Sequence, residues 1–434
     1  MTPSARLSAA IELLDSLDAQ AGPAEHRIRK YFRTRRYAGS KDRRWVTEFL
    51  FLMARRRGEV DWRLEQTGLP QTNRLRATCA LIVFQDIKFS DLSDGYFSGP
   101  HAAPYLTEDE RTGFEKLEGL DFGDMPDHAK GNFPAWLTEE LKEQYAEKAL
   151  PIMQICMERA PLTLRVNSLK TDRDRVLDLL AADEIDANPA QNSPDGIIIA
   201  QSVNLNQHAV IEQGLVEIQD EAAQISARLA CPAPGMQVVD YCAGAGGKSL
   251  AMAAGMENAG QIYAFDVSRD RMKDIASRSR RAGVRNIEAV QLFEDERDDE
   301  ILGRLAEQAD RVFVDAPCSG SGTWRRQPDR KWSFTEERLG DLTALQEGIL
   351  KKASLLVKPG GWLIYATCSI FRQENERQIE KFLAENTEFS LVPVSDIWAS
   401  AGLNGKHEGP FLQILPSSGG ADGFFTAILC RKSG

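Results

Sequence analysis

Residues Gln237-Val-Val-Asp-Tyr-Cys-Ala-Gly-Ala-Gly-Gly-Lys-Ser249 decide the fold that this sequence predicts. Val238 and Val239 are β-branched residues that suit a buried parallel strand. The glycines that follow allow unusual φ angles and let the backbone approach a ligand closely. A helical pattern opens at Lys248, so free N–H groups at the start of a helix would face a ligand above the strand end. The stretch therefore predicts a nucleotide-binding turn.

The spacing Gly-x-Gly-Gly-Lys differs from two common nucleotide-binding turns. It lacks the last glycine of the dinucleotide fingerprint, and it is shorter than the phosphate loop that ends in Gly-Lys-Ser/Thr. A glycine loop that binds nothing is the alternative for this stretch taken alone. The choice between the two readings depends on the rest of the chain.

Three further strand patterns end in residues with functional side chains. Gln261-Ile-Tyr-Ala-Phe-Asp266 ends in an acid about twenty residues past the glycines, where a carboxylate can bind ribose hydroxyls. Asp310-Arg-Val-Phe-Val-Asp315 is followed by Ala-Pro-Cys318, and Trp362-Leu-Ile-Tyr-Ala366 is followed by Thr-Cys368. Two cysteines are thus expected at the edge of the sheet to which the glycine turn points, which indicates thiol chemistry beside a nucleoside site.

Three motifs in chain order resemble those of the Sun-type (Fmu or RsmB-like) RNA cytosine-5 methyltransferases. They are Cys242-Ala-Gly-Ala-Gly-Gly-Lys248, Asp315-Ala-Pro-Cys-Ser-Gly320 and Thr367-Cys-Ser369, reinforced upstream by Leu164-Arg-Val-Asn167 and Gln219-Asp-Glu-Ala222. The resemblance covers roughly residues 130 to 432 well and the first 130 loosely. It implies S-adenosylmethionine as cofactor, RNA as partner and 5-methylcytosine as product, with small-subunit rRNA favoured over tRNA.

The chemistry of such a transfer requires a cysteine. Carbon 5 of cytosine is a poor nucleophile until a thiolate adds at carbon 6. The resemblance makes Cys368 the nucleophile and Cys318 the cysteine that helps to release the product. Without the resemblance, either cysteine could be the nucleophile and the other could release the product. DNA cytosine methyltransferases use the cysteine of a Pro-Cys motif as nucleophile, and here that cysteine is Cys318. Asp315 is expected to hydrogen-bond the cytosine and help to protonate ring nitrogen 3.

The resemblance also implies a set of cofactor-binding residues. They are Cys242, Ala243, Gly244, Ala245, Gly246, Gly247, Lys248, Asp266, Arg271, Glu294 and Asp315.

Some of these assignments carry alternatives. Lys248 is also expected to hold Asp315 or the base, and Arg271 could equally be a solvated helix charge. The family has an aspartate for the adenine amino group where this chain has Phe293, followed by Glu294. We expect a Cβ at Gly246 to enter the space that the ligand needs.

The predicted fold class is α/β: a Rossmann-type methyltransferase domain with an antiparallel edge hairpin, preceded by a small α+β subdomain and an all-helical domain. The 434 residues divide into 1–88 (helical, NusB-like and RNA-binding), 89–133 (linker), 134–221 (α+β, RNA-recognition-like) and 222–434 (catalytic). The hairpin comes from two strand patterns, Pro410–Pro416 and Asp422–Cys430, which have no helix between them. A dehydrogenase would be expected to continue with βα units instead.

Charge is distributed unevenly along the chain. The net charge of −11 argues against indiscriminate nucleic-acid binding. A dense basic set nevertheless lies between His26 and Arg76: Arg27, Arg29, Lys30, Arg33, Arg35, Arg36, Lys41, Arg43, Arg44 and Arg55 to Arg57. This set favours an RNA surface over a merely solvated helix face, and we expect it to contribute affinity rather than chemistry.

Two other groups of residues are candidates for RNA binding. Arg165 and Asn167 could bind RNA or active-site backbone, or could be structural. A basic stretch after the Asp315 motif is expected to line the RNA entrance: Trp324, Arg325, Arg326, Arg330 and Lys331.

The seven scattered cysteines predict neither disulfides nor a metal site. No run of eighteen apolar residues and no secretory start are found, so a cytoplasmic protein without a membrane span is expected. We expect a monomer. Two other functional classes compete: a small-molecule or protein methyltransferase, which has no need of two strand-end cysteines, and a non-catalytic RNA-binding assembly factor, which has no need of intact motifs.

Overall fold

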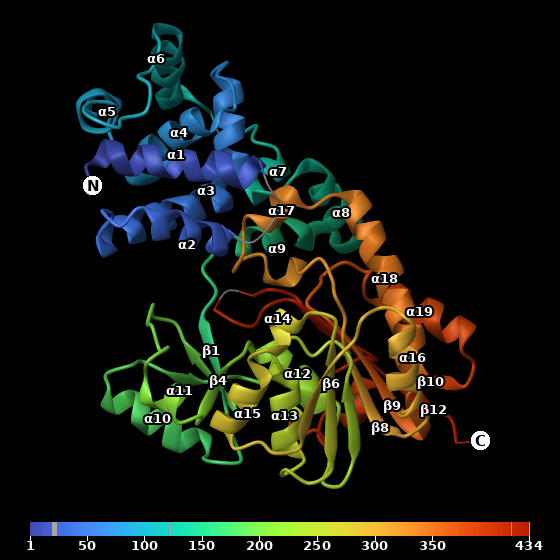
Figure 1. Cartoon of the computed structure of the whole chain (residues 1–434). Coiled ribbons are helices and arrows are strands. Elements are labelled where there is room, and N and C mark those ends of the chain that lie inside the picture. The colour runs from blue at the N-terminus through green and yellow to red at the C-terminus, as the bar shows by residue number, and fades with distance from the viewer. Residues whose placement is uncertain (20–23, 122, 418, 434) are drawn as a thin grey trace. The chain divides into compact units, whose positions relative to one another are not determined.

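A computed structural model describes residues 1–19, 24–121, 123–417 and 419–433 of the chain. It forms two compact units (Figure 1). Unit 1 comprises Met1–Arg159 and Trp324–Thr335, and unit 2 comprises Ala160–Thr323 and Glu336–Gly434. The short segment Trp324–Thr335 therefore belongs with the N-terminal part of the chain, although the residues on both sides of it belong to unit 2.

Every regular element in the described residues of unit 1 is a helix. Its helices are α1 (Pro3–Ala19), α2 (Ala24–Thr34), α3 (Ser40–Gln66), α4 (Asn73–Gln85), α5 (Phe89–Tyr96), α6 (Glu108–Glu115), η1 (Lys116–Gly119), α7 (Asp127–Gly131), α8 (Ala135–Tyr145), η2 (Ala146–Lys148), α9 (Ala149–Ile155) and α17 (Arg330–Ser333). Leu7 of α1, Phe49 of α3 and Leu75 of α4 meet in one buried core. Within each of these helices the buried residues recur at helical spacing and so lie on one face, as the sequence predicts.

The prediction of a linker over residues 89–133 is wrong. Helices α5, α6 and α7 lie in this range, and Leu92, Phe97 and Phe114 are buried in the same core as α1, α3 and α4. Helices of one or two turns are too short to show a clear 3.6-residue period, which is why the sequence pattern misses them. Helices α8 and α9 also group with unit 1, whose first segment ends at Arg159.

Unit 2 opens with a small sheet. Its strands are β1 (Leu162–Val166), β2 (Asn188–Pro189), β3 (Gly196–Ile199) and β4 (Val216–Ile218), in the order β2-β3-β1-β4 with antiparallel pairs throughout. Helices α10 (Arg173–Ala182) and α11 (Ala209–Glu212) bury Val176 and Val210 against strand residues such as Leu164. This confirms the predicted small α+β subdomain.

A larger mixed sheet forms the rest of unit 2. Its strands are β5 (Gln237–Asp240), β6 (Gln261–Asp266), β7 (Ile287–Gln291), β8 (Ala309–Asp315), β9 (Val357–Thr367), β10 (Phe389–Val392), β11 (Leu412–Ile414) and β12 (Phe424–Arg431). They lie in the order β10-β12-β9-β8-β5-β6-β7, with β11 beside β12. Strands β5 to β9 are parallel, and β12 is antiparallel to β9.

Helices cover both faces of this sheet (Figure 1). On one face α12 (Glu221–Leu229) and α13 (Gly247–Gly255) pack on Val238 and Ile364. On the other face α18 (Glu336–Ser354) and α19 (Glu376–Glu385) pack on Val239 and Val312. The remaining elements are α14 (Arg269–Met272), α15 (Ile275–Ala282), α16 (Glu296–Gly303), η3 (Ser321–Thr323) and α20 (Val394–Ile397).

The predicted C-terminal hairpin is present as β11 and β12, which pair antiparallel. Strand β11 pairs with the first half of β12 and β10 with its second half, both on the side of β12 away from β9. Strand β10 has only four residues, so its short pattern is easily overlooked in the sequence. Within the described ranges, no helix has both the length and the apolar character to cross a membrane.

Candidate active site

Parallel strands bring four polar strand ends to one edge of the large sheet. Asp240 ends β5, Asp266 ends β6, Asp315 ends β8 and Thr367 ends β9. The register pairs Asp315 with Ala366, one residue before Thr367. Because the carboxyl ends of parallel strands share an edge, the motifs that follow these strands converge, as the sequence predicts.

The glycine turn is shaped by left-handed backbone and held from outside by two arginines. Gly244 and Gly246 have φ angles of 55° and 78°, and Gly246 is the residue before the first turn of α13. The Arg165 guanidinium donates to the Gly247 carbonyl at 2.7 Å, and the Arg278 guanidinium donates to the Ala245 carbonyl at 2.5 Å. The turn is thus fixed by contacts that leave its inner side free.

Arg165 binds active-site backbone in the glycine turn, and Asn167 is a structural residue. Burial lowers the pKa of the Arg165 guanidinium to about 10, and its hydrogen bond to Gly247 links β1 to the turn. The Asn167 amide donates to the Gly214 carbonyl at 2.9 Å and to the Ala282 carbonyl at 2.8 Å. Of the alternatives that the sequence left open, the geometry favours attachment of the small sheet to the large one.

Asp266 lies directly beside the glycine turn. Its carboxylate accepts from the Gly244 N–H at 2.9 Å and from the Ser268 N–H at 2.7 Å, and the side chain is largely buried. A carboxylate fixed in this way keeps further lone pairs for ribose hydroxyls. Arg271 is exposed on the short helix α14.

The two glycines of the turn differ in what a side chain would meet. A Cβ built on Gly246 would lie 3.1 Å from Ile275, so a larger residue there would disturb the packing of α15. It would also strain the backbone, because the φ angle of Gly246 is positive. A Cβ on Gly244 would meet no atom within 4 Å. The expectation that Gly246 faces the ligand space is therefore corrected, because Gly244 is the position that opens to free space.

The residues present fit S-adenosylmethionine. Gly244 opens to space beside the Asp266 carboxylate, which suits close approach of a ribose. One oxygen of the buried Asp240 carboxyl has no hydrogen-bond partner among the described residues, while the other accepts from Ser249 at 2.6 Å. Burial raises the pKa of Asp240 to about 7. Asp240 ends the decisive strand but belongs to none of the motifs from which the site is predicted.

Glu294 is exposed and has a φ angle of 59°. Its backbone N–H donates to the buried Asp298 carboxylate at 2.8 Å, and the Phe293 N–H donates to the same side chain. Asp298, which the sequence analysis did not single out, thus holds the loop that carries the predicted adenine contact.

Lys248 and Asp315 form an ion pair, as predicted, with 2.5 Å between Nζ and Oδ2. Burial alone would lower the pKa of Lys248, but the Asp315 carboxylate outweighs this effect and raises it. The ammonium also lies 5.2 Å from the Phe424 ring. Lys248 therefore carries a proton beside the predicted cytosine-binding carboxylate.

The two predicted cysteines face each other across the strand ends. The Sγ atoms of Cys318 and Cys368 are 3.5 Å apart. The hydrogen bond with Cys368, together with burial, raises the pKa of the Cys318 thiol well above its usual range. Burial also raises the pKa of Cys242. A thiol of this kind stays protonated at neutral pH, so Cys318 and Cys242 are poor nucleophiles in the unliganded protein.

The predicted RNA-entrance stretch after the Asp315 motif is mostly buried. Trp324, Arg325 and Lys331 have relative exposures of 0, 1 and 0%, and the Trp324 ring packs 5.7 Å from those of Phe133 and Phe334 within unit 1. Arg330 keeps its exposure. The prediction that this stretch lines an RNA entrance is therefore wrong for its buried residues. They pack into unit 1, because burial of the aromatic side chains stabilises the segment there.

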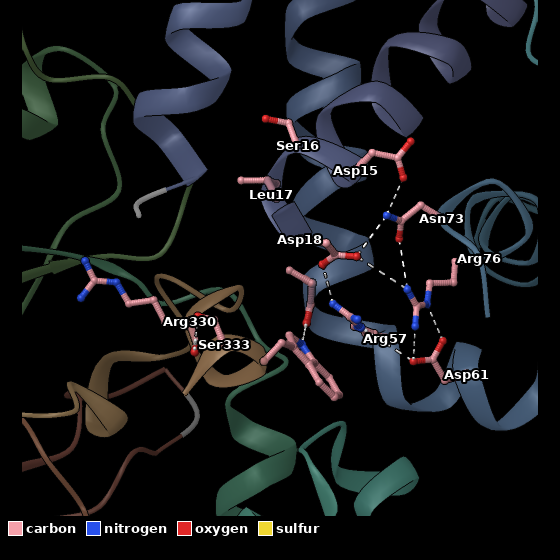
Figure 2. Close-up of polar contacts among 12 residues, drawn as sticks. Asp15, Ser16, Leu17, Asp18, Arg57, Asp61, Asn73, Arg76, Arg330 and Ser333 are labelled. Carbon is pink, nitrogen blue, oxygen red and sulfur yellow. Dashed lines mark hydrogen bonds and ion pairs between the residues drawn. The ribbon is translucent and has the colours of Figure 1, made fainter. Parts of the chain in front are cut away.

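Some arginines of the N-terminal basic set form ion pairs within unit 1. Figure 2 shows Arg57 with Asp18 and Asp61, and Arg76 between the same two acids. Arg35 pairs with Glu12. Six exposed cations of α2, the following turn and the first turn of α3 have no ion pair with any described residue: Arg29, Lys30, Arg33, Arg36, Lys41 and Arg44. We call these six residues the α2 basic face.

Across the described ranges, no group of three or more His, Cys, Asp or Glu side chains has an arrangement that could hold a metal ion.

Comparisons with known proteins agree with this geometry. A family model described as "16S rRNA methyltransferase RsmB/F" matches residues 227–430, and a second, "Methyltr_RsmF/B-like, ferredoxin-like domain", matches residues 133–206. The ribosomal RNA small subunit methyltransferase B of Vibrio vulnificus is 34% identical over 308 residues, which cover 70% of this chain and 68% of that protein.

Longer matches exist at lower identity. A probable ribosomal RNA small subunit methyltransferase B of Synechocystis sp. is 29% identical over 411 residues, covering 89% of this chain and 91% of the relative. The crystal structure of PH0851 superimposes with a TM-score of 0.77 at 27% identity and covers 99% of both chains.

Proposed function

Because the chain belongs to the RsmB/F family of 16S rRNA methyltransferases, we propose that it methylates carbon 5 of a cytosine in small-subunit rRNA through a covalent cysteine adduct. The chain is an S-adenosylmethionine-dependent RNA methyltransferase. The covalent route is carried by one observation: two thiols from separate strand ends lie 3.5 Å apart, beside the Lys248–Asp315 pair.

Cofactor binding falls to the glycine turn from Cys242 to Lys248 and to Asp266. Asp266 takes the ribose hydroxyls, and Gly244 leaves room for close approach. Arg271 and Glu294 complete the proposed set from exposed positions at the rim. When bound, S-adenosylmethionine supplies an electrophilic methyl group.

The cytosine chemistry falls to Cys368, Asp315, Lys248 and Cys318. The Cys368 thiolate adds to carbon 6, and the electron pair of the 5,6 double bond moves to carbon 5, which becomes nucleophilic. Asp315 accepts from the cytosine amino group, and the adjacent Lys248 ammonium supplies positive charge and a proton near ring nitrogen 3. After methylation carbon 5 carries a proton that a base must remove before the Cys368–carbon 6 bond can break.

Cys318 suits that last step. It is a thiol in the RNA-free protein, so it must first release its own proton to water; its thiolate then takes the carbon 5 proton, directly or through a water molecule, and Cys368 leaves as a thiolate. The environment that raises the pKa of Cys318 makes its thiolate a stronger base than an ordinary thiolate.

The order of these steps predicts different products from two variants. Cys368→Ala forms no adduct and no 5-methylcytosine. Cys318→Ala adds and methylates but stays bonded to its product, so a slow, protein-linked RNA band appears on denaturing gels with S-adenosylmethionine present. An adduct in Cys368→Ala alone would give the nucleophile role to Cys318. Adducts in neither variant would reject the covalent route.

The RNA target is tested separately from the mechanism. Bisulfite sequencing of RNA from a deletion strain should show a cytosine of 16S rRNA that loses its protection from conversion. Loss of protection in tRNA instead would reject the rRNA proposal. Unchanged protection in all RNA would favour a non-catalytic assembly factor.

A further inference from the structure

Glu374 is a fully buried carboxylate in the loop between β9 and α19. Four donors surround it, two for each oxygen. Oε1 accepts from the Ser319 N–H at 2.8 Å and from the Gln346 amide at 3.0 Å. Oε2 accepts from the hydroxyls of Ser319 and Ser369, both at 2.5 Å. A buried charge persists when it is hydrogen-bonded in this way.

The residues that Glu374 binds are the immediate neighbours of the two thiols. Ser319 follows Cys318, and Ser369 follows Cys368, although 50 residues separate the two motifs. The register between β8 and β9 ends at Asp315 and Ala366, so both cysteines lie beyond the ladder. Hydrogen bonds outside the sheet must therefore set the distance between the thiols.

Other contacts of the same network hold Glu374 itself. The Tyr365 hydroxyl donates to the Glu374 carbonyl at 2.7 Å, and the Asn375 amide donates to the Ser369 carbonyl at 3.0 Å. A second link between the loops runs through Ser321, whose Oγ accepts from the Ile370 N–H at 2.9 Å. The carboxylate is thus a fixed point to which both cysteine loops are attached.

We infer that Glu374 is a positioning residue whose carboxylate holds the loops of Cys318 and Cys368 at the separation that both thiols need to act on one cytosine. The inference rests on the proposed function for its consequence in catalysis, but its geometric part concerns the thiols of the RNA-free protein alone. Glutamine at this position would keep the size of the side chain. Its amino group would face one of the two pairs of donors, so the two hydrogen bonds of that pair would lose their acceptor.

The test compares Glu374→Gln with Glu376→Gln. Glu376 lies two residues further on and accepts from Gln413 at 2.9 Å, away from both cysteine loops. The first measurement is the rate at which diamide oxidises Cys318 and Cys368 to a disulfide in RNA-free protein, followed by peptide mapping. We expect Glu374→Gln to form this disulfide at least about tenfold more slowly, and Glu376→Gln to match the wild type.

The second measurement separates kcat from KM. A displacement of about 1 Å costs on the order of 100-fold in rate, so kcat should fall by roughly 10- to 100-fold in Glu374→Gln. The KM for RNA and the affinity for S-adenosylmethionine should stay within about twofold, because Glu374 touches neither the glycine turn nor the α2 basic face.

If Glu374→Gln fails to fold, Ser319→Ala and Ser369→Ala supply the same test, since each removes one hydroxyl from the carboxylate. Both should slow disulfide formation, and the double variant should lose less than the product of the two effects. Wild-type disulfide rates in these variants would overturn the inference. If these variants form the disulfide slowly but the adduct experiment rejects a Cys368 adduct, the positioning role stands. Only the proposed covalent function is then rejected.

Discussion

Lys331 is a charged residue inside a protein core. It is fully buried in unit 1, and its Nζ has no hydrogen-bond partner among the residues that the structure describes. The Phe133 ring lies 4.7 Å from the ammonium. Burial lowers the pKa of Lys331 from 10.5 to about 7, and the nearby Arg55 and Arg56 act in the same direction. A lysine commonly buries its aliphatic chain while its ammonium stays in water, but in Lys331 the ammonium is buried as well.

Replacing Lys331 by Met should stabilise the protein in a pH-dependent way. The folded state binds fewer protons than the unfolded state between about pH 7 and 10.5, so the destabilisation is complete below pH 7 and is relieved as pH rises. We expect Lys331→Met to raise the free energy of unfolding by on the order of 5 kcal/mol at pH 6 and by little at pH 10.5.

Urea unfolding at pH 6, 8 and 10 measures this difference. Lys331→Arg is the matched control, because a guanidinium keeps its charge throughout this range and should destabilise at every pH. A constant difference between Lys331→Met and the wild type at all three pH values would contradict a buried, easily deprotonated lysine.

At the scale of elements, helix α2 separates an apolar face from a basic one. Ala24, Ile28 and Phe32 are buried in the core of unit 1. Arg29, Lys30 and Arg33 of the α2 basic face point outward and make no ion pair with another described residue. Phosphate contacts by such free cations supply affinity for RNA with a strong dependence on salt. The paired arginines of α3 offer much less to a phosphate, because each would first have to leave its carboxylate.

Removing two cations of this face should weaken RNA binding and reduce its salt dependence. The variant Lys30→Ala/Lys41→Ala is compared with Lys351→Ala/Lys352→Ala, which removes two exposed lysines from α18. The slope of log K against log salt should fall by roughly 1 to 2 in the first variant, since each phosphate contact contributes about 0.7 to 0.9. Equal slopes in the two variants would exclude the α2 basic face from the RNA footprint.

At the scale of the whole molecule, the chain connects its two units through the residues that follow the proposed catalytic motif. Thr323 belongs to unit 2, Trp324–Thr335 to unit 1, and Glu336 again to unit 2. Within unit 1 the Trp332 indole donates to the Ala54 carbonyl at 2.7 Å, and Trp324 packs against Phe133. Deleting the N-terminal helices would therefore remove the packing surface of this segment.

Deletion of residues 1–130 should lower methylation even at saturating RNA, beyond the loss of affinity that the basic sequence alone predicts. The exposed segment should be cut by trypsin after Arg325, Arg326 or Arg330 much faster than in the full chain, where Arg325 is buried. Mass spectrometry of the digest reports the cut sites, with cleavage near the exposed Lys351 and Lys352 as an internal reference. Equal protection of the segment in both proteins would show that the N-terminal helices do not hold it.

The sequence by itself determined the parallel strands of the large sheet and the motifs at their carboxyl ends, but not strand β10. Strand patterns, the glycine turn and the cysteine motifs are local features, so each can be read from a few neighbouring residues. Parallel pairing then requires Asp266, Asp315, Cys318 and Cys368 to meet at one edge. The Lys248–Asp315 pair agrees with the same logic, because Asp315 ends β8 and Lys248 lies in the first turn of the helix that follows the neighbouring strand β5.

Only the tertiary structure decided which charges are free and which are neutralised or buried. Arg57 pairs with Asp18 from 39 residues away, and Lys331 lies in a core built by helices from the other end of the chain. Glu374 reads in the sequence as one acid among several near the start of a helix. Three of its four donors come from Ser319, after β8, and from Gln346, in α18, which lie 55 and 28 residues away in the sequence. Burial and ion pairing depend on partners that folding brings together, and no local pattern records those partners.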